Sequence, residues 1–351
     1  MRGNKTLDTH VRVVYYFYMD APETLLKAIE AFSDPQKAFE AAVDFRWPGG
    51  NVTCPRCDGT KHSFIKTRRI WFCYDCKKQF TVKVGTVMED SPIDLGKWMS
   101  AIWMLANCKN GISSYELAKN LGIRQNSAWF MLQRIRLAMK NNSKLKIGTG
   151  GEPVEVDETF VGGKHKNMHV KRRQRIKDGW ERENKTIVMG MLDRDTRQVR
   201  AKVIPDVSRL TLQGEILNKV SKAAPVYTDA AVGYNRMAIK GFVHETVNHM
   251  EEYVRGEVHT NSIENFWSLL KRSLHGTYVA VEPFHLERYV DEQVFRFNNR
   301  ATKDNKLTDA DRFALVMSQV NGKRLTYSEL TGKGTDTVCH PEAGTGQEEP
   351  F

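Results

Sequence analysis

The sequence predicts an α+β protein of several domains. Its 351 residues exceed the size of one small domain, and 40% of them are hydrophobic, which is enough for more than one core. Two Cys-x-x-Cys pairs mark a compact unit early in the chain, and helical periodicity follows them. After the Gly-rich stretch at 141–153, strand-like alternation begins. We therefore expect a cysteine-rich, helical N-terminal half and a mixed C-terminal half.

The charge of the chain points to polyanionic partners. Its formal net charge is +11, which favours nucleic acid first and an anionic membrane surface second, although a merely soluble basic protein is also compatible with this value. The sequence contains no apolar run of eighteen residues, so we expect no membrane span. The apolar patch at 11–19 is followed by acidic residues rather than by a signal-peptide cleavage region. A cytoplasmic protein with reduced cysteines is the expectation, and the resemblance described below adds that it is a bacterial protein associated with the nucleoid.

Changes in sequence texture predict the domain boundaries. Pro35 suits the first turn of a helix within a helical pattern over 20–45. The last twenty residues are polar and rich in Gly and Pro, which predicts disorder. The predicted segments are an N-terminal helical segment at 1–50, a cysteine-rich segment at 51–90, a helical region at 91–147, a domain of strands and helices at 148–300 and a C-terminal extension with a disordered tail at 301–351; the motifs below predict a zinc ribbon, a helix-turn-helix and a catalytic domain for the three middle segments.

The two cysteine pairs predict a structural zinc site. Fifteen residues separate "CPRC" from "CYDC", and this spacing is typical of four-cysteine zinc sites, in which each pair supplies two thiolates to one tetrahedral ion. Two redox motifs are the alternative, but they would need a βαβ pattern that is absent here. Four thiolates leave no open position for a substrate, so the ion would serve folding. The predicted ligands are Cys54, Cys57, Cys73 and Cys76.

The segment "SSYELAKNLGIRQNSAWFMLQRIRLAM" has the pattern of a helix-turn-helix. Ala118 allows two helices to approach closely, and Gly122 suits the turn between them. Gln125 and Asn126 would then open a second helix and face base edges, while Arg134 would contact phosphate. An ordinary helical hairpin uses the same apolar spacing, so this motif is weak on its own.

The C-terminal half predicts three strands, a helix and a fourth strand, followed by a long helical region. The strands are "PVEVDETFVG", "KTIVMGMLDR", "QVRAKVI" and "APVYTD", and the helix is "TLQGEILNKVSK". A strongly basic run at 164–185 lies between the first two strands. Its charge suggests contact with a DNA backbone, and a solvated loop is the alternative.

Three acidic residues stand where these elements end. Asp157 is expected at the end of the first strand, Asp229 at the end of the fourth, and Glu264 in the first turn of the following helix. Two aspartates and a glutamate in this order on a βββαβα pattern predict a site for two Mg²⁺ ions in an RNase H-like fold, because Mg²⁺ prefers oxygen ligands. Taken singly, Asp157 could be surface charge like its neighbours Glu155 and Glu158, and Asp229 could cap a turn.

The helix in "HTNSIENFWSLLKR" combines an apolar and a polar stripe. The apolar stripe is Ile263, Trp267, Leu270 and Leu274. Glu264 and Lys271 share the adjacent polar face, so a metal-bound carboxylate and a cation, with Arg272 beside it, would lie along one nucleic-acid backbone. A capping box from Asn261 to Glu264 is the simpler reading and is compatible with metal binding. His259 could assist with phosphate or water.

These motifs together resemble the DDE transposases of bacterial insertion sequences, in the zinc-ribbon ISXO-like group. The resemblance covers roughly residues 20–330 and is carried by "CPRC…CYDC", "VEVDETFVGGK", "VYTDAAVGY" and "HTNSIENFWSLLKR". It implies that Asp157, Asp229 and Glu264 are the catalytic acids. Many relatives have Gly after the glutamate, whereas this chain has Asn265, which could share the ligand role.

The resemblance implies a DNA transposase. Such an enzyme binds the ends of its element as double-stranded DNA, cleaves them and joins the resulting 3′-OH to target DNA, and it acts as a homo-oligomer because two ends must be joined. An inert, zinc-dependent DNA-binding regulator derived from a transposase is the alternative, and a nuclease that cuts without joining is a weaker one. An intact set of three acids favours the enzyme.

Overall fold

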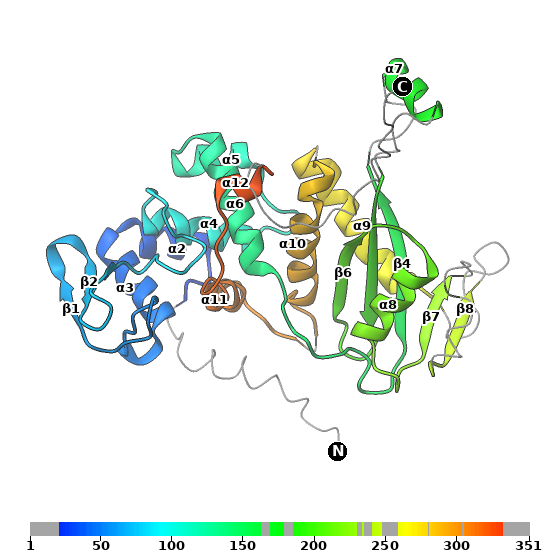
Figure 1. The fold of residues 1–351 in the computed structure, drawn as a ribbon, viewed down its shortest axis with the longest axis horizontal. Coiled ribbons are helices and arrows are strands. Elements are labelled where there is room, and N and C mark those ends of the chain that lie inside the picture. Colours follow the sequence, from blue (N-terminus) through cyan, green and yellow to red (C-terminus); the bar gives the residue numbers. More distant parts are fainter. Residues whose placement is uncertain are drawn as a thin grey trace, which may run out of the picture.

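The computed structural model describes residues 21–162, 169–178, 185–229, 234, 241–247, 259–279, 281–303 and 305–332. Figure 1 shows a helical unit with the cysteine-rich ribbon at one end of the molecule and a sheet domain at the other. Within these described segments, no helix is both long enough and apolar enough to cross a lipid bilayer.

The N-terminal unit is built from helices around a small three-stranded sheet. Asp34 caps the second helix with its carboxylate, and Pro35 occupies the first turn as expected. The sheet has the order β1-β2-β3 and is antiparallel throughout. The elements are α2 (Leu25–Ser33), α3 (Pro35–Arg46), η1 (Pro48–Gly50), β1 (His62–Ile65), η2 (Lys66–Arg68), β2 (Ile70–Cys73), β3 (Gln79–Phe80), α4 (Leu95–Asn107), α5 (Ser114–Leu121) and α6 (Gln125–Met139).

A sharp turn separates α5 from α6. Gly122 ends α5 in the left-handed conformation, with φ of 60°, which glycine adopts without steric cost. Leu117 is completely buried, and Leu121 and Ile123 pack partly buried against the same core. The two predicted helices and the glycine turn between them are therefore present.

The C-terminal part of the chain returns to the N-terminal core. α11 (Asp309–Ser318) contributes Phe313, Val316 and Met317 to the same hydrophobic cluster as α3, α4 and α6. The side-chain amide of Asn107 on α4 donates to the carbonyl of Asp309 at 3.1 Å. A short helix, α12 (Tyr327–Leu330), follows. The part of the predicted extension at 305–332 is thus packed into the N-terminal unit, while the expected tail at 333–351 lies outside the described residues.

The second unit is a five-stranded mixed sheet with the order β6-β5-β4-β7-β8. β4, β5 and β6 are antiparallel neighbours, whereas β7 and β8 run parallel to β4. Its elements are β4 (Val154–Val161), α7 (Val170–Lys177), β5 (Thr186–Asp193), β6 (Val199–Ile204), α8 (Arg209–Lys219), β7 (Val226–Asp229), β8 (His244–Val247), α9 (Asn261–Ser273), the π-helical turn η6 (Leu274–Tyr278), η7 (Pro283–His285) and α10 (Leu286–Asn298).

Helices cover both faces of this sheet. α8 packs Leu212 and Ile216 against one face in a cluster with Val154 and Val156 of β4. α9 and α10 cover the other face in a separate cluster that includes Val188 of β5. The apolar stripe predicted for α9 is buried in this second cluster, which explains why a helix with so many polar residues on its other face forms here.

Two features of the sheet differ from expectation. β4 continues to Val161 because it pairs with β5 along its whole length, so Asp157 lies inside the strand rather than at its end. The short strand β8 was not predicted; it pairs with β7 through Val226 to Asp229. Its sequence "HETV" is too short and too polar for periodicity to identify it.

Candidate active site and zinc centre

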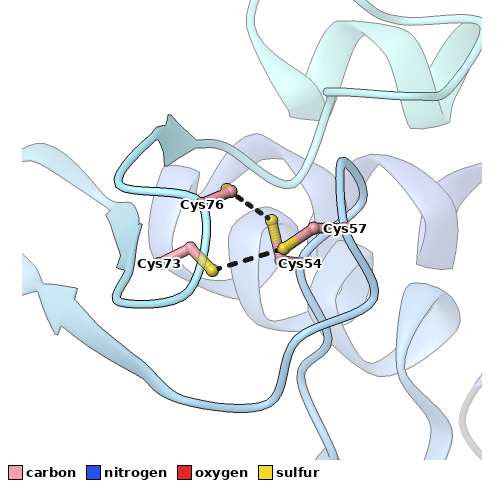
Figure 2. A group of neighbouring side chains, drawn as sticks. All are labelled: Cys54, Cys57, Cys73 and Cys76. Carbon is pink, nitrogen blue, oxygen red and sulfur yellow. Dashed lines mark hydrogen bonds between the residues drawn. The ribbon is translucent and has the colours of Figure 1, made fainter.

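The four predicted zinc ligands come together in one place. Cys54 and Cys57 lie in the turn before β1, and Cys73 and Cys76 lie at the end of β2 and in the turn after it. All four sulfur atoms lie within 4.8 Å of one another, and they face a common centre in Figure 2. In the described residues this is the one group of three or more Cys, His, Asp or Glu side chains that is so compact.

The spacing of the sulfurs fits a zinc ion. The Sγ atoms of Cys54 and Cys76 are 3.7 Å apart, and those of Cys57 and Cys73 are 3.6 Å apart. Zinc–sulfur bonds of about 2.3 Å in a tetrahedron place the sulfurs about 3.8 Å apart. Backbone N–H groups of Cys76 and Asp75 favour the Cys73 thiolate and lower the pKa of Cys73 to about 7. The donor set therefore suits a structural zinc ion.

The ribbon is fixed to the helices by aromatic rings. Trp71 of β2 stacks on Phe80 with ring centroids 5.6 Å apart and meets Trp47 edge-on at 5.2 Å. Phe39 of α3 stacks on Trp71 at 5.8 Å. Because Trp71 and Phe80 lie on the strands next to the cysteines, the zinc centre and this aromatic cluster support each other.

The sheet places the two predicted aspartates side by side on neighbouring strands. β4 and β7 pair in parallel with Val154 opposite Val226 and Glu155 opposite Tyr227. Continued for two residues, this register places Asp157 beside Asp229 on neighbouring strands, which are about 4.8 Å apart in a sheet. Asp157 and Asp229 each lie two residues after the Glu155–Tyr227 pair. Because side chains alternate along a strand, they face the same side as that pair, which is the side that α9 covers.

α9 carries Glu264 to the same face. The indole N–H of Trp267 on α9 donates to Oδ2 of Asp157 at 2.9 Å. Gly190 of β5 lies opposite Asp157, and a Cβ atom there would come within 2.6 Å of the Trp267 ring. A glycine at this position lets the helix lie close to the strand, and Glu264 stands one turn before Trp267.

The charges of Asp229 and Glu264 act on the carboxyl group of Asp157. Burial raises the pKa of Asp157 to about 6, the Trp267 N–H opposes this shift, and the charges of Asp229 and Glu264 add to it. The neighbouring Glu158 has a pKa raised to about 8, first by burial and then by Asp157 and Asp229. Carboxylates that raise one another's pKa form a site that a cation would stabilise.

The carboxylates of Asp157, Asp229 and Glu264 are not gathered as closely as the cysteine sulfurs, since among the described residues the four cysteines are the one group of potential metal ligands that is so compact.

The start of α9 differs from the predicted capping box. Thr260 is the N-cap residue, Asn261 is the first helical residue and Glu264 is the fourth. The capping-box interpretation was therefore wrong, because the cap comes from another element: Oε2 of Glu155 accepts from the backbone N–H of Ser262 at 2.9 Å and of Ile263 at 3.0 Å.

The residues predicted to contact DNA fall into two groups. Asn126, Lys271 and Arg272 are exposed, and Gln125 is half-buried and donates to Ser114 Oγ at 2.8 Å. Arg134 is buried and donates to the backbone carbonyls of Leu325, Val87 and Glu89. A guanidinium that is used in this way inside the protein is not placed to meet phosphate.

The structure also describes the two predicted accessory residues, His259 and Asn265, and part of the basic run. Nδ1 of His259 lies 2.8 Å from Nη2 of Arg194, in the loop before α9. Asn265 is exposed beside Glu264 on α9. The basic run at 164–185 contains α7, which projects from the β4–β5 side of the sheet in Figure 1; residues 163–168 and 179–184 lie outside the described residues.

Sequence reasoning missed two residues at this site. Glu155 was treated only as a neighbour of Asp157, and Arg194 was not considered. The alternation of side chains along β4 could have revealed Glu155. Glu155 and Asp157 face the same side of the sheet, so a helix that covers Asp157 also buries Glu155. Trp267 was assigned to the core stripe, which is correct, but its polar N–H needed a partner there.

Comparisons with known proteins match both units of the chain. Residues 149–298 match the model of the ISXO2-like transposase domain, and residues 33–79 match that of the transposase zinc-ribbon domain. An "uncharacterized protein in transposable element ISH50" of Halobacterium salinarum is 27% identical over 260 residues, which are 70% of this chain and 85% of that protein. An "uncharacterized transposase-like protein" of Haemophilus influenzae is 34% identical over 101 residues, which are 29% of this chain and 81% of that protein.

Proposed function

Because the chain belongs to the ISXO2-like transposase family, we propose that it is a DNA transposase that cleaves the ends of an insertion sequence and joins them to target DNA. The observation that carries this proposal is the placement of Asp157, Asp229 and Glu264 on one face of the sheet. The family suggests the class of reaction, and the three acids would provide the place where it occurs.

The topology of the sheet domain supports an RNase H-like fold. Three antiparallel strands followed by a helix and a parallel strand are the βββαβ pattern expected from the sequence, and the strand order β6-β5-β4-β7-β8 places the first strand in the centre. In this arrangement the central strand and its parallel neighbour present the two aspartates together. α9 then adds the glutamate from the covering layer.

The carboxylates of Asp157, Asp229 and Glu264 would hold two Mg²⁺ ions, which supply positive charge to the attacking and leaving oxygens of an in-line displacement when bound. The residues fit such ions because all three offer oxygen donors and because burial, with a further contribution from the charges of Asp229 and Glu264, raises the pKa of Asp157, so that a cation would stabilise its ionised form. The indole N–H of Trp267 donates to Oδ2 of Asp157 at 2.9 Å, which would orient this carboxylate for an ion.

The proposed reaction has two steps at this one site. In the first, water attacks the phosphorus at the element end, the bond to the 3′ oxygen breaks, and that oxygen leaves as a 3′-OH after taking up a proton. In the second, this hydroxyl attacks a target phosphodiester and displaces a target 3′ oxygen. Exposed Lys271 and Arg272, two turns after Glu264 on α9, would hold the phosphates of the same strand.

The N-terminal unit would bind the ends of the element. The ribbon presents basic residues on η2 and beside it, and α5 and α6 form a helix-turn-helix whose second helix begins with Gln125 and exposed Asn126. α7 adds a strongly basic sequence, "VKRRQRIK", beyond the sheet. We expect a homo-oligomer on DNA, since two ends must be joined.

The test is a cleavage and joining assay on labelled element ends with purified full-length protein and Mg²⁺. Asp157→Asn should abolish both products while end binding, measured by gel shift, stays unchanged. Asp44→Asn changes an exposed aspartate on α3 and serves as the matched control. Absence of any Mg²⁺-dependent product from the wild-type protein would favour an inert DNA-binding regulator, and cleavage without joined product would favour a nuclease.

A further inference from the structure

The N-terminus of α9 is capped by a residue from the sheet. The first backbone N–H groups of a helix have no partner within it and need an acceptor. At α9 the side chain of the N-cap residue does not supply one. Glu155 of β4 does so instead, with Oε2 at 2.9 Å from the N–H of Ser262 and 3.0 Å from that of Ile263. A carboxylate at this end also interacts favourably with the helix dipole.

The second oxygen of Glu155 is occupied as well. Oε1 accepts from Nε of Arg194 at 2.7 Å. Nη2 of the same guanidinium lies 2.7 Å from the carbonyl oxygen of His259, just before α9, and the guanidinium lies over the ring of Tyr227 at 4.9 Å. Glu155 is completely buried. With both oxygens engaged in this way, Glu155 is not placed to bind a metal ion itself.

Glu155 and Asp157 therefore hold α9 at two points. The two residues lie on the same face of β4 and are about 6.6 Å apart along the strand. Their partners on α9, Ile263 and Trp267, are four residues and about 6 Å apart along the helix. The matching distances keep helix and strand in one register, and Glu264 lies between the two points of attachment.

We infer that Glu155 is a positioning residue: together with Arg194 it fixes the register of α9 along β4 and so the place of the Glu264 carboxylate relative to Asp157. This inference rests on the proposed function, because it assigns Glu155 to the catalytic site through Glu264. Loss of the cap would let the first turn of α9 fray or shift while Trp267 still holds the second turn. Glu264 lies in the part that would move.

The test compares Glu155→Gln with Glu152→Gln in the full-length protein. Gln has the shape of Glu, but its NH₂ group would oppose either the N–H donors of α9 or the Arg194 guanidinium. Glu152 is exposed in the loop before β4 and is the matched control. Two quantities are measured: the Mg²⁺ concentration for half-maximal end cleavage, and amide hydrogen exchange of the first turn of α9, at residues 261–266.

We expect Glu155→Gln to raise the half-maximal Mg²⁺ concentration about tenfold, as is typical when a residue that orients a metal ligand is changed, and to speed exchange in 261–266. End binding should stay unchanged. Glu152→Gln should alter none of these. A folded Glu155→Gln protein with wild-type Mg²⁺ dependence would overturn the inference.

The two proposals can fail separately. If the wild-type protein shows no Mg²⁺-dependent cleavage, the proposed function fails, while hydrogen exchange still decides whether Glu155 anchors α9. If Glu155→Gln does not fold, Arg194→Lys replaces it. Lysine can reach Glu155 but not also the His259 carbonyl, so a smaller rise in the Mg²⁺ requirement is expected, and an unchanged requirement would overturn the inference.

Discussion

Replacing Glu292 should destabilise the protein more than any surface charge does, because Glu292 is the one acid between two buried arginines. Its carboxylate is completely buried on α10. It accepts from Nε of Arg136 on α6 at 2.6 Å, from Nη1 of Arg296 and from the hydroxyl of Tyr278 in η6. A Cβ atom on Gly111 would collide with the Tyr278 hydroxyl, so the loop after α4 also encloses this cluster.

The magnitude follows from the charges that remain. Arg136, Glu292 and Arg296 carry a net charge of +1, and Glu292→Gln would leave +2 in the interior. Removing one member of a buried ion pair costs about 3–5 kcal/mol, a large part of a stability of about 5–15 kcal/mol. The cation–π contact of Arg136 with Tyr289, at 3.9 Å, offsets only a fraction of this. We expect Glu292→Gln to lower the free energy of unfolding by about 5 kcal/mol, the upper end of the range for breaking a buried ion pair.

The surface pair of Glu215 and Lys202 is the matched control. Its nitrogen–oxygen distance is 2.7 Å, nearly that of the Arg136–Glu292 pair, but its side chains are 19% and 54% exposed, against 0% and 1% for Glu292 and Arg136. Surface pairs contribute about 0–1 kcal/mol, so Glu215→Gln should be almost neutral. The equal distances make burial the variable that is tested.

The assay is urea-induced unfolding followed by tryptophan fluorescence and circular dichroism. A third variant, Arg136→Met, leaves Glu292 paired with Arg296 and the interior neutral, so it should cost less than Glu292→Gln. The reasoning is wrong if Glu292→Gln lies within about 1 kcal/mol of Glu215→Gln, or if Arg136→Met proves the more damaging change.

The pH dependence of this cluster has a definite sign. Burial alone would raise the pKa of Glu292, but the guanidinium groups of Arg296 and Arg136 and the Tyr278 hydroxyl outweigh it and hold the pKa below its ordinary value. The cluster therefore contributes its full stability above the unfolded-state pKa of about 4.3. That contribution is lost as the pH falls through the lower pKa of the folded state.

Four further predictions address other parts of the molecule. Gly190→Ala should push Trp267 away from Asp157, costing about 1–3 kcal/mol of stability and most of the cleavage activity in the end-cleavage assay. Burial raises the pKa of Asp291 to about 7. The cost of keeping this carboxyl buried therefore begins above its unfolded-state pKa of about 3.9 and grows until the pH passes the folded-state pKa. Asp291→Asn should raise the melting temperature more at pH 8.5 than at pH 5.5, which differential scanning calorimetry would detect. Removing zinc with a chelator should unfold the ribbon and shift its tryptophan fluorescence. Lys171→Ala combined with Lys177→Ala on α7 should lower the slope of log K against log salt for DNA binding by about 2, whereas an unchanged slope would mean that α7 does not contact the backbone.

The parts of the fold that the sequence predicted well have strong local signals. The zinc centre is defined by four cysteines at fixed spacing, and the structure brings all four sulfurs together. The apolar stripe of α9 has a period of 3.6, and Ile263, Trp267, Leu270 and Leu274 are all buried. Alternation predicted β4 and β6, and a continuous apolar run predicted β5. Each of these patterns depends only on the sequence of a single helix, strand or pair of turns.

The parts that were missed depend on contacts between elements. Arg134 has the appearance of a surface cation on α6, but three carbonyl groups from distant segments surround it. Asn261 is a good N-cap residue by type, yet Glu155 caps α9 from over a hundred residues away. Neither partner can be recognised from local sequence, because a buried polar group needs only some donor or acceptor and not one at a fixed spacing.

The buried cluster around Glu292 also connects the proposed DNA-binding motif with the proposed catalytic site. α6, the second helix of the proposed DNA-binding motif, is joined to α10 through Arg136–Glu292 and through Gln133, whose amide donates to the Tyr289 hydroxyl at 3.2 Å. Tyr278 brings in η6, the direct continuation of α9. Moving α6 relative to α9 would expose or unpair these charges at a cost of several kcal/mol. We therefore expect the proposed DNA-binding motif and α9 to move as one body. Binding of an element end to α6 would then also fix the position of Glu264 at the proposed cleavage site.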